Sequence, residues 1–136
     1  MINFNSSAGR KAKKLLSSET ISWLTTVGSD LTPQPRPVWF VPDGDDVLIY
    51  SQPKAAKVAH IRNHPNVALH FNADQWGSDE TIVVLTGAAA LEESTNPQPA
   101  AYIKKYKKDM AELGMTPEQF AASYSIPIRI KIAGIR

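Results

Sequence analysis

The segment PQPRPVWFVPDGDDVLIYSQPKAAKVAHIRNHPNVALHF, from Pro33 to Phe71, decides the fold. Its two apolar runs, PVWFV and VLIYS, flank a cluster of proline, glycine and aspartate at 42–46 that favours a hairpin loop. The next part is polar and basic, and we expect a short helix that opens at Pro53 and ends within 63–66. The run VALHF then predicts a further strand.

Strand patterns also lie on both sides of this segment. The run TISWLTTV (20–27) is rich in β-branched and aromatic residues, and TIVVLTGAAAL (81–91) is another apolar strand. The last run, IPIRIKIAGIR (126–136), alternates isoleucine with charged residues and predicts a half-buried antiparallel strand. Helices are expected around 11–18, at 97–110 and at 116–124, where Thr-Pro-Glu is a helix-opening pattern.

These elements predict a mainly β protein of the α+β class. Six or more strands at short spacing, with only small helices between them, favour a small antiparallel barrel over a parallel sheet, which needs long crossovers. We expect one domain over residues 1–136, with a basic helix or arm at 1–19.

The composition excludes several classes of function. The chain has no cysteine, so it has no disulfide, thiolate metal site or cysteine nucleophile. A formal net charge of +2 argues against a nucleic-acid partner, although a basic nucleic-acid-binding barrel stays open as an alternative. No segment has the length of a membrane span, and the first residues do not form a secretion signal, so we expect a cytoplasmic protein.

The sequence carries no familiar catalytic or metal motif. It lacks a nucleophile elbow, a Walker loop and a dinucleotide-binding glycine loop, and we predict no side chain as a catalytic residue. His60 and His64 are four residues apart, but the glutamate of a zinc-protease helix is missing. We therefore predict no metal site.

The run SQPKAAKVAHIRNHP, which begins at Ser51, contains the best candidate for an anion site. On a helix, Lys54, Lys57 and His60 would recur along one edge. The amino end of that helix, near Ser51 and Gln52, would also present unpaired N–H groups that suit phosphate. A solvated basic helix face is the alternative, and the residue types alone leave both interpretations open.

Three prolines surround Gln34 and Arg36, immediately before Trp39 and Phe40. Because proline cannot donate to a sheet ladder, this pattern indicates an edge strand or an irregular entry to a strand. Such a backbone could offer main-chain groups to the rim of a flat heterocycle. Protection of the edge against aggregation is the alternative explanation.

Taken in order, these features resemble one family. The pattern PVWF, then Asp-Gly, an apolar strand and SQPKAAKVAHIRNHP is similar to the split β-barrel of pyridoxamine-phosphate-oxidase-like flavoproteins, and within it to the branch that uses the deazaflavin coenzyme F420. The resemblance extends over roughly 21–136. Two departures stand out, because PVWFV lacks the arginine with which FMN oxidases grip a terminal phosphate, and Leu31 follows Asp30 where the family often has glycine.

The resemblance implies a homodimer with two cofactor sites at the subunit interface. It places the cofactor ring over the strand formed by Pro35, Arg36, Pro37, Val38 and Trp39. It places the cofactor phosphate on Ser51, Gln52, Lys54 and Lys57. The loop that holds Trp76 and Gly77 is similar in position to one that approaches the ring.

The activity that the resemblance implies is hydride transfer from reduced coenzyme F420 to a conjugated small molecule, such as a quinone, an enone or a linear tetrapyrrole. In such an enzyme the cofactor supplies the reactive group and the protein orients it. The alternatives are an FMN-binding flavoprotein of the same family and a non-catalytic carrier of F420.

Overall fold

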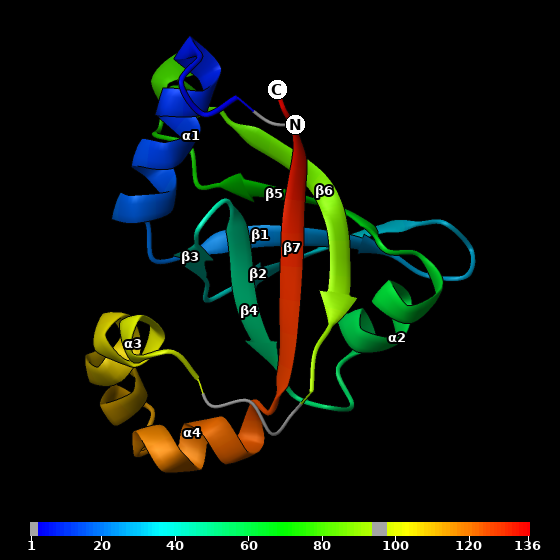
Figure 1. Cartoon of the computed structure of the whole chain (residues 1–136), viewed down its shortest axis with the longest axis vertical. Coiled ribbons are helices and arrows are strands. Elements are labelled where there is room, and N and C mark those ends of the chain that lie inside the picture. Colours follow the sequence, from blue (N-terminus) through cyan, green and yellow to red (C-terminus); the bar gives the residue numbers. More distant parts are fainter. Residues whose placement is uncertain (1–2, 94–97) are drawn as a thin grey trace.

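A computed structural model describes residues 3–93 and 98–136. Within these residues, seven antiparallel strands form one sheet in the order β2-β1-β5-β6-β7-β4-β3 (Figure 1). The strands are β1 (Ser22–Val27), β2 (Pro33–Val38), β3 (Val41–Asp43), β4 (Asp46–Ser51), β5 (Asn66–Phe71), β6 (Val84–Leu91) and β7 (Ile126–Ile135). The predicted fold class, mainly β with six or more antiparallel strands and short helices, is confirmed.

The two edges of the sheet are consecutive in the chain. β2 forms one edge and β3 the other, and only Trp39 and Phe40 lie between them. The Cα atoms of Val38 and Val41 can therefore be no more than about 11 Å apart, which is three Cα spacings. A sheet whose edge strands lie so close together must curl into a barrel, and the barrel is split where β2 and β3 meet without pairing.

The prediction that PVWFV forms one strand of a hairpin with VLIYS is wrong in part. The run breaks at Trp39 and Phe40, and only the short β3 pairs with β4. The break arises because β2 is held by β1 on one side of the barrel, while β3 belongs to the other side. The predicted hairpin turn is present, and Gly44 adopts the positive φ of 62° that such a turn requires.

Four α-helices and one short 3₁₀ helix accompany the sheet in the described residues: α1 (Ser7–Ser18), α2 (Ala56–Asn63), η1 (Asp79–Thr81), α3 (Ala100–Glu112) and α4 (Pro117–Ser123). Helix α4 opens as predicted, with a capping box between Thr116 and Gln119. Helix α2 begins at Ala56, later than predicted, because Pro53 and Lys54 form a turn. Pro97, the expected start of the third helix, lies outside the described residues.

The buried side chains form two clusters. The first, which we call the barrel core, lies inside the sheet and includes Leu24, Val47, Ile49, Leu69, Leu85, Ile128 and Ile130. The second, which we call the aromatic cap, joins α3 and α4 to the outside of β3 and β4. It consists of Trp39, Val41, Leu48, Tyr50, Tyr102, Tyr106, Met110, Met115, Phe120 and Tyr124.

Two observations concern membrane spans and metal sites. None of the helices in the described residues has the length and apolar character needed to cross a membrane. Within 3–93 and 98–136, no three potential metal-ligating side chains come together.

Candidate functional site

Helix α3 covers the split in the barrel. The backbone N–H of Phe40 donates to the Tyr106 hydroxyl at 2.8 Å, and that hydroxyl lies 2.8 Å from the carbonyl oxygen of Thr20 and 2.9 Å from that of Phe40. Lys105 also donates to the Phe40 carbonyl, at 2.9 Å, and its ammonium lies 3.7 Å from the centre of the Phe40 ring. Side chains of α3 thus satisfy backbone groups that no strand pairs.

Beside this contact lies an aromatic cavity of about 310 Å³. The rings of Tyr106, Trp39, Phe120 and Tyr124 stack one on the next, with centroid distances of 4.6, 5.1 and 4.3 Å. Trp39, Phe120 and Tyr124 line the cavity together with the further aromatic side chains of Tyr50 and Tyr102. Parallel, closely spaced rings favour a flat, conjugated ligand.

A second cavity, of about 240 Å³, has a different character, and we call it the basic cavity. It is lined by Arg36 on β2, by Lys57 and His60 on α2, and by Thr26 on β1. His60 is held in place because its Nδ1 lies 2.9 Å from the Thr26 hydroxyl. Helix α2 has no side-chain cap at Ala55, so the N–H groups of its first turn are free of a capping side chain.

The charge of Lys57 is poorly compensated. Burial, and then the neighbouring Arg36 guanidinium, lowers the pKa of Lys57. An anion bound in the basic cavity would offset both effects, because it would pair with the ammonium group and separate it from the guanidinium. The residues of this cavity therefore fit a phosphate.

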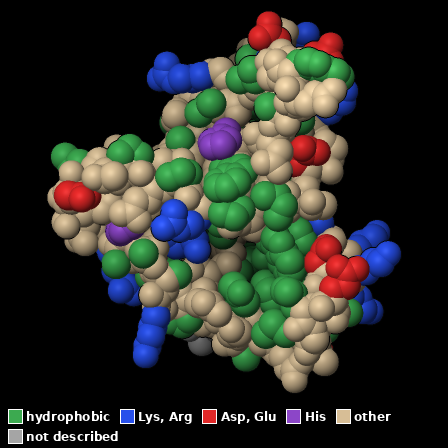
Figure 2. Space-filling view, turned by 180° about the vertical axis from the view of Figure 1, so that it is seen from behind, with side chains coloured by type: hydrophobic (Ala, Val, Ile, Leu, Met, Phe, Trp, Pro, Cys, Tyr) green, Lys and Arg blue, Asp and Glu red, His purple; other side chains and the backbone are tan. Residues whose placement is uncertain are grey.

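The two cavities are neighbours, since Pro37 and Lys57 line both of them. Figure 2 shows a hollow with hydrophobic side chains in it and a group of cationic side chains close beside it. The arrangement offers a place for a flat ring next to a place for an anion.

Five of the predicted site residues line these cavities. Arg36 faces the basic cavity, Val38 and Trp39 face the aromatic one, and Pro37 and Lys57 face both. The predicted edge position of β2 is also confirmed, and its prolines are exposed. Pro35 lies on the same strand, where its carbonyl oxygen accepts a hydrogen bond from Arg36 at 2.8 Å.

The remaining predicted residues line neither cavity. The buried Ser51 hydroxyl donates to the carbonyl oxygen of Gln52, and the exposed Gln52 side chain lies 3.5 Å from the Ser123 hydroxyl on α4. Lys54 is exposed in the turn before α2 and so is not on a helical edge with Lys57. Their contact with a phosphate stays a prediction.

Trp76 and Gly77 lie in the loop between β5 and η1. The η1 helix that follows this loop is tied to α1, because Lys11 donates to the carbonyl oxygen of Asp79 at 2.7 Å. Trp76 is 79% exposed, and Gly77 has a positive φ of 63°. Within one chain, the loop does not contribute to either cavity.

The sequence reasoning missed the part of the aromatic cavity that comes from β4, α3 and α4, namely Tyr50, Tyr102, Phe120 and Tyr124. A signal was present, since Tyr102, Tyr106 and Met110 recur every four residues and form the buried face of α3. The lysines between these residues predict a solvated face of the helix instead.

The family model described as Pyridoxamine 5'-phosphate oxidase matches residues 8–131. The chain belongs to this family. The family includes oxidoreductases and flavin-binding proteins, and the matched range contains all of the residues that line the basic cavity. The predicted resemblance to pyridoxamine-phosphate-oxidase-like split barrels is therefore confirmed. A search of curated proteins found no match.

Solved structures of several proteins share the fold of this family member. One described as an F420 reductase has a TM-score of 0.69 and 24% identity, over 91% of this chain and 94% of its own. General Stress Protein 26 from Bacillus anthracis str. Sterne has a TM-score of 0.66 and 20% identity, over 93% and 89%. The heme storage protein HutZ from Vibrio cholerae has a TM-score of 0.65 and 11% identity, over 96% and 94%. At these identities the likeness shows the fold alone.

Proposed function

We propose that this protein is a homodimeric oxidoreductase that uses reduced coenzyme F420 to transfer a hydride to a conjugated small molecule. The observation that carries the proposal is the adjacency of the basic and aromatic cavities, which share Pro37 and Lys57. A deazaflavin cofactor has a flat ring joined to an anionic tether: the tether matches the basic cavity, the exposed strand β2 beside it would support the ring, and the aromatic cavity is left for the acceptor. The family membership and the F420 reductase of the same fold support this choice of cofactor.

The basic cavity would hold the anionic tether. Arg36 and Lys57 would supply charge, and the first turn of α2 would supply N–H donors. Ser51, Gln52 and Lys54 precede that turn, and we propose that they complete the phosphate contacts. Lysine and a single arginine suit a phosphodiester, whereas FMN ends in a phosphate dianion that favours several guanidinium groups.

The strand from Pro35 to Trp39 would support the ring. When bound, the reduced deazaflavin supplies a hydride, and a proton from solvent completes the reduction of the acceptor. The side chains of this chain would bind and orient the cofactor and the acceptor, and would exclude water from the site. The stacked rings of Trp39, Phe120 and Tyr124 would form the walls of the acceptor site.

A second copy of the chain would complete the site. The sheet carries a shallow, mainly apolar depression of about 470 Å³, lined by residues that include Val27, Ala68 and Ala88. Exposed apolar surface of this kind commonly marks an interface. We propose that the partner covers it and brings its own copy of the loop with Trp76 and Gly77 to the ring. The expected partners are thus a second copy and a small-molecule substrate.

Titration of the purified protein with F420 and with FMN tests the cofactor. We expect F420 to change in fluorescence at micromolar protein concentration and FMN to bind more weakly. Equal or tighter binding of FMN would overturn the choice of F420 and favour an FMN-binding flavoprotein. If reduced F420 binds but no quinone or enone oxidises it, the protein is a carrier.

Lysine variants test the anion site. We expect the double substitution Lys54→Ala and Lys57→Ala to weaken F420 binding by well over tenfold, with most of the loss in Lys57→Ala alone because only Lys57 lines the cavities. Lys108→Ala, on the exposed face of α3, is the matched control and should bind F420 like the wild type. Unchanged affinity in the double variant would remove both lysines from the site.

Sedimentation of the wild type tests the dimer, and Trp76→Ala tests the contribution of the partner loop. We expect a dimer at micromolar concentration and weaker F420 binding in the variant, with the dimer intact. A monomer that binds F420 as tightly as the dimer would contradict the shared site.

A further inference from the structure

Helix α3 carries two buried tyrosines one turn apart, and their hydroxyls differ. The Tyr106 hydroxyl has backbone partners on Phe40 and Thr20. The Tyr102 hydroxyl has no hydrogen-bond partner among the described residues, although Tyr102 is 0% exposed. A buried hydroxyl that lacks a partner is costly and rare, so its presence calls for a ligand or another explanation.

Tyr102 is part of the wall of the aromatic cavity. The other cavity-lining side chains are mainly apolar or aromatic, and the ammonium group of Lys57 is the cation among them. Burial raises the pKa of Tyr102, so its hydroxyl keeps its proton at neutral pH and acts as a donor. No acceptor for this proton is present among the described residues, and a bound ligand with an acceptor oxygen would supply one.

The size of the cavity limits the molecule that could supply this acceptor. A volume of about 310 Å³ is at the lower end of the range for small-molecule sites and suits one or two fused rings. A linear tetrapyrrole, with four rings in a row, exceeds this volume. A quinone or a cyclic enone is flat, suits a cavity with an aromatic lining and carries a carbonyl oxygen.

We propose that Tyr102 donates a hydrogen bond to a carbonyl oxygen of a quinone or cyclic enone bound in the aromatic cavity. The proposal rests on the proposed function and narrows its acceptor to these two classes. Tyr102 would fix the orientation of the acceptor and favour the build-up of negative charge on its oxygen during reduction. It would act as a binding and specificity residue, while the proton comes from solvent.

Two flat ligands, one with carbonyl oxygens and one without, isolate the hydrogen bond from Tyr102. Calorimetric titration of the wild type with 1,4-naphthoquinone and with naphthalene should show about tenfold tighter binding of the quinone, equivalent to about 1.4 kcal/mol. Tyr102→Phe should bind naphthalene as the wild type does and lose the preference for the quinone. The chain has no cysteine, so the quinone cannot form a thiol adduct.

Tyr106→Phe is the matched control, because it makes the same chemical change one turn away. It should keep the preference for the quinone while its unfolding temperature falls. Tyr102→Phe should unfold at the same or a higher temperature than the wild type, since it removes a hydroxyl without a partner. A Tyr102→Phe protein that retains the full preference, or a wild type without one, would overturn the proposal.

Titration of the same variants with F420 separates this proposal from the proposed function. F420 binding should be unaffected by Tyr102→Phe. If F420 fails to bind while the preference for the quinone depends on Tyr102, the proposed function is wrong and the Tyr102 contact stands. If F420 binds and the preference for the quinone is absent, the Tyr102 contact is wrong and the proposed function stands.

Discussion

The barrel core consists of apolar side chains that pack between strands, whereas the aromatic cap carries hydroxyl groups and borders a cavity. In the core, pairing along six strand interfaces fixes the backbone around most of the side chains. In the cap, two helices rest on one side of the barrel, and the buried Tyr102 hydroxyl has no hydrogen-bond partner within 3–93 and 98–136.

Under the proposed function, stability and binding are located in different parts of this small protein. The core can be filled completely because nothing has to enter it. The cap keeps a cavity and a hydroxyl with no partner among the described residues; both cost stability, and both belong to the proposed acceptor site.

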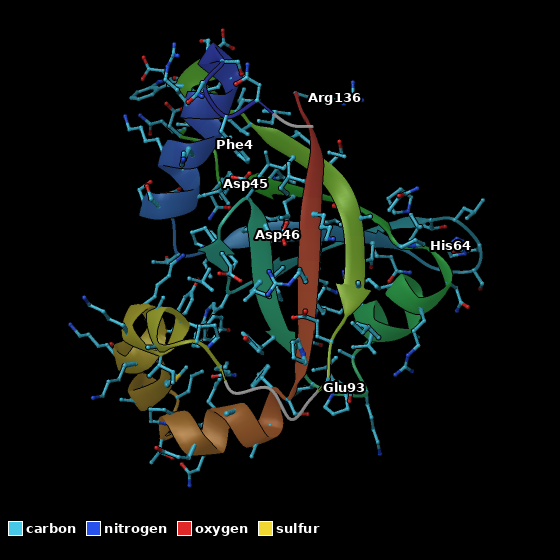
Figure 3. The ribbon with its side chains drawn as sticks, viewed as in Figure 1. Phe4, Asp45, Asp46, His64, Glu93 and Arg136 are labelled. Carbon is cyan, nitrogen blue, oxygen red and sulfur yellow. The ribbon has the colours of Figure 1, made fainter. Side chains whose placement is uncertain are left out.

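A small region outside both clusters also belongs to the framework. Arg129 on β7 pairs with Asp43, Asp46 and Glu92 at 3.0–3.2 Å and so ties the β3–β4 hairpin to β6 and β7. Figure 3 shows Asp46 and Asp45 close to Phe4, which lines a small cavity with them under α1. These contacts hold the edge elements of the sheet in place.

The largest expected effect comes from the core. Leu69→Ala should lower the free energy of unfolding by about 2–5 kcal/mol, because Leu69 is 1% exposed and a cavity would remain. Leu113→Ala makes the same change at the rim of the aromatic cavity, where the side chain is 59% exposed, and should shift stability by about 0.5 kcal/mol or less. Urea unfolding measures both, and equal losses would break the distinction between the two regions.

Within the cap, the two tyrosines should differ. Tyr106→Phe leaves the N–H of Phe40 without its acceptor and should cost about 1–3 kcal/mol in urea unfolding. Tyr102→Phe should not lower the free energy of unfolding. A similar loss in both variants would show that the Tyr102 hydroxyl has a partner in the free protein.

A turn outside both regions should show a smaller effect of opposite sign. Leu31 has a positive φ of 64°, in the hairpin between β1 and β2. Since glycine adopts this conformation without steric cost, Leu31→Gly should raise the free energy of unfolding by about 0.5–1 kcal/mol. Gly44→Ala, at a φ of 62°, should lower it, and a loss of stability in Leu31→Gly would contradict this account.

The last expected effect is a pH dependence at the contact between the regions. Burial lowers the pKa of Lys105 from 10.5 to about 8. Between these values the unfolded chain binds more protons than the folded one, so this group makes stability rise with pH from about 8 to 10.5. The stability of the wild type relative to Lys105→Met should rise over that range in urea unfolding. A difference in stability that stays constant or falls with pH would show that the ring of Phe40 stabilises the ammonium group enough to cancel the effect of burial on the pKa of Lys105.

The strands and most helices could be predicted because their patterns are local. The alternation in 126–136 and the turn at 42–46 each require only neighbouring residues. The start of α2 was misplaced because Pro53 fits both a turn and a first helical turn. The break at Trp39 was missed because a continuous apolar run gives no sign of where a strand changes sides of a barrel.

For the site, the sequence by itself determined which residues carry charge and flat rings, and it placed Arg36, Trp39 and Lys57 in the predicted set. Only the tertiary structure decided that α3 and α4 fold over the split, so that the Tyr106 hydroxyl has hydrogen-bond partners and the Tyr102 hydroxyl has none in the part of the chain that the structure describes. The physical reason is distance along the chain: residues sixty or so positions apart meet through long-range packing, and no local period encodes which of two buried tyrosines finds a partner.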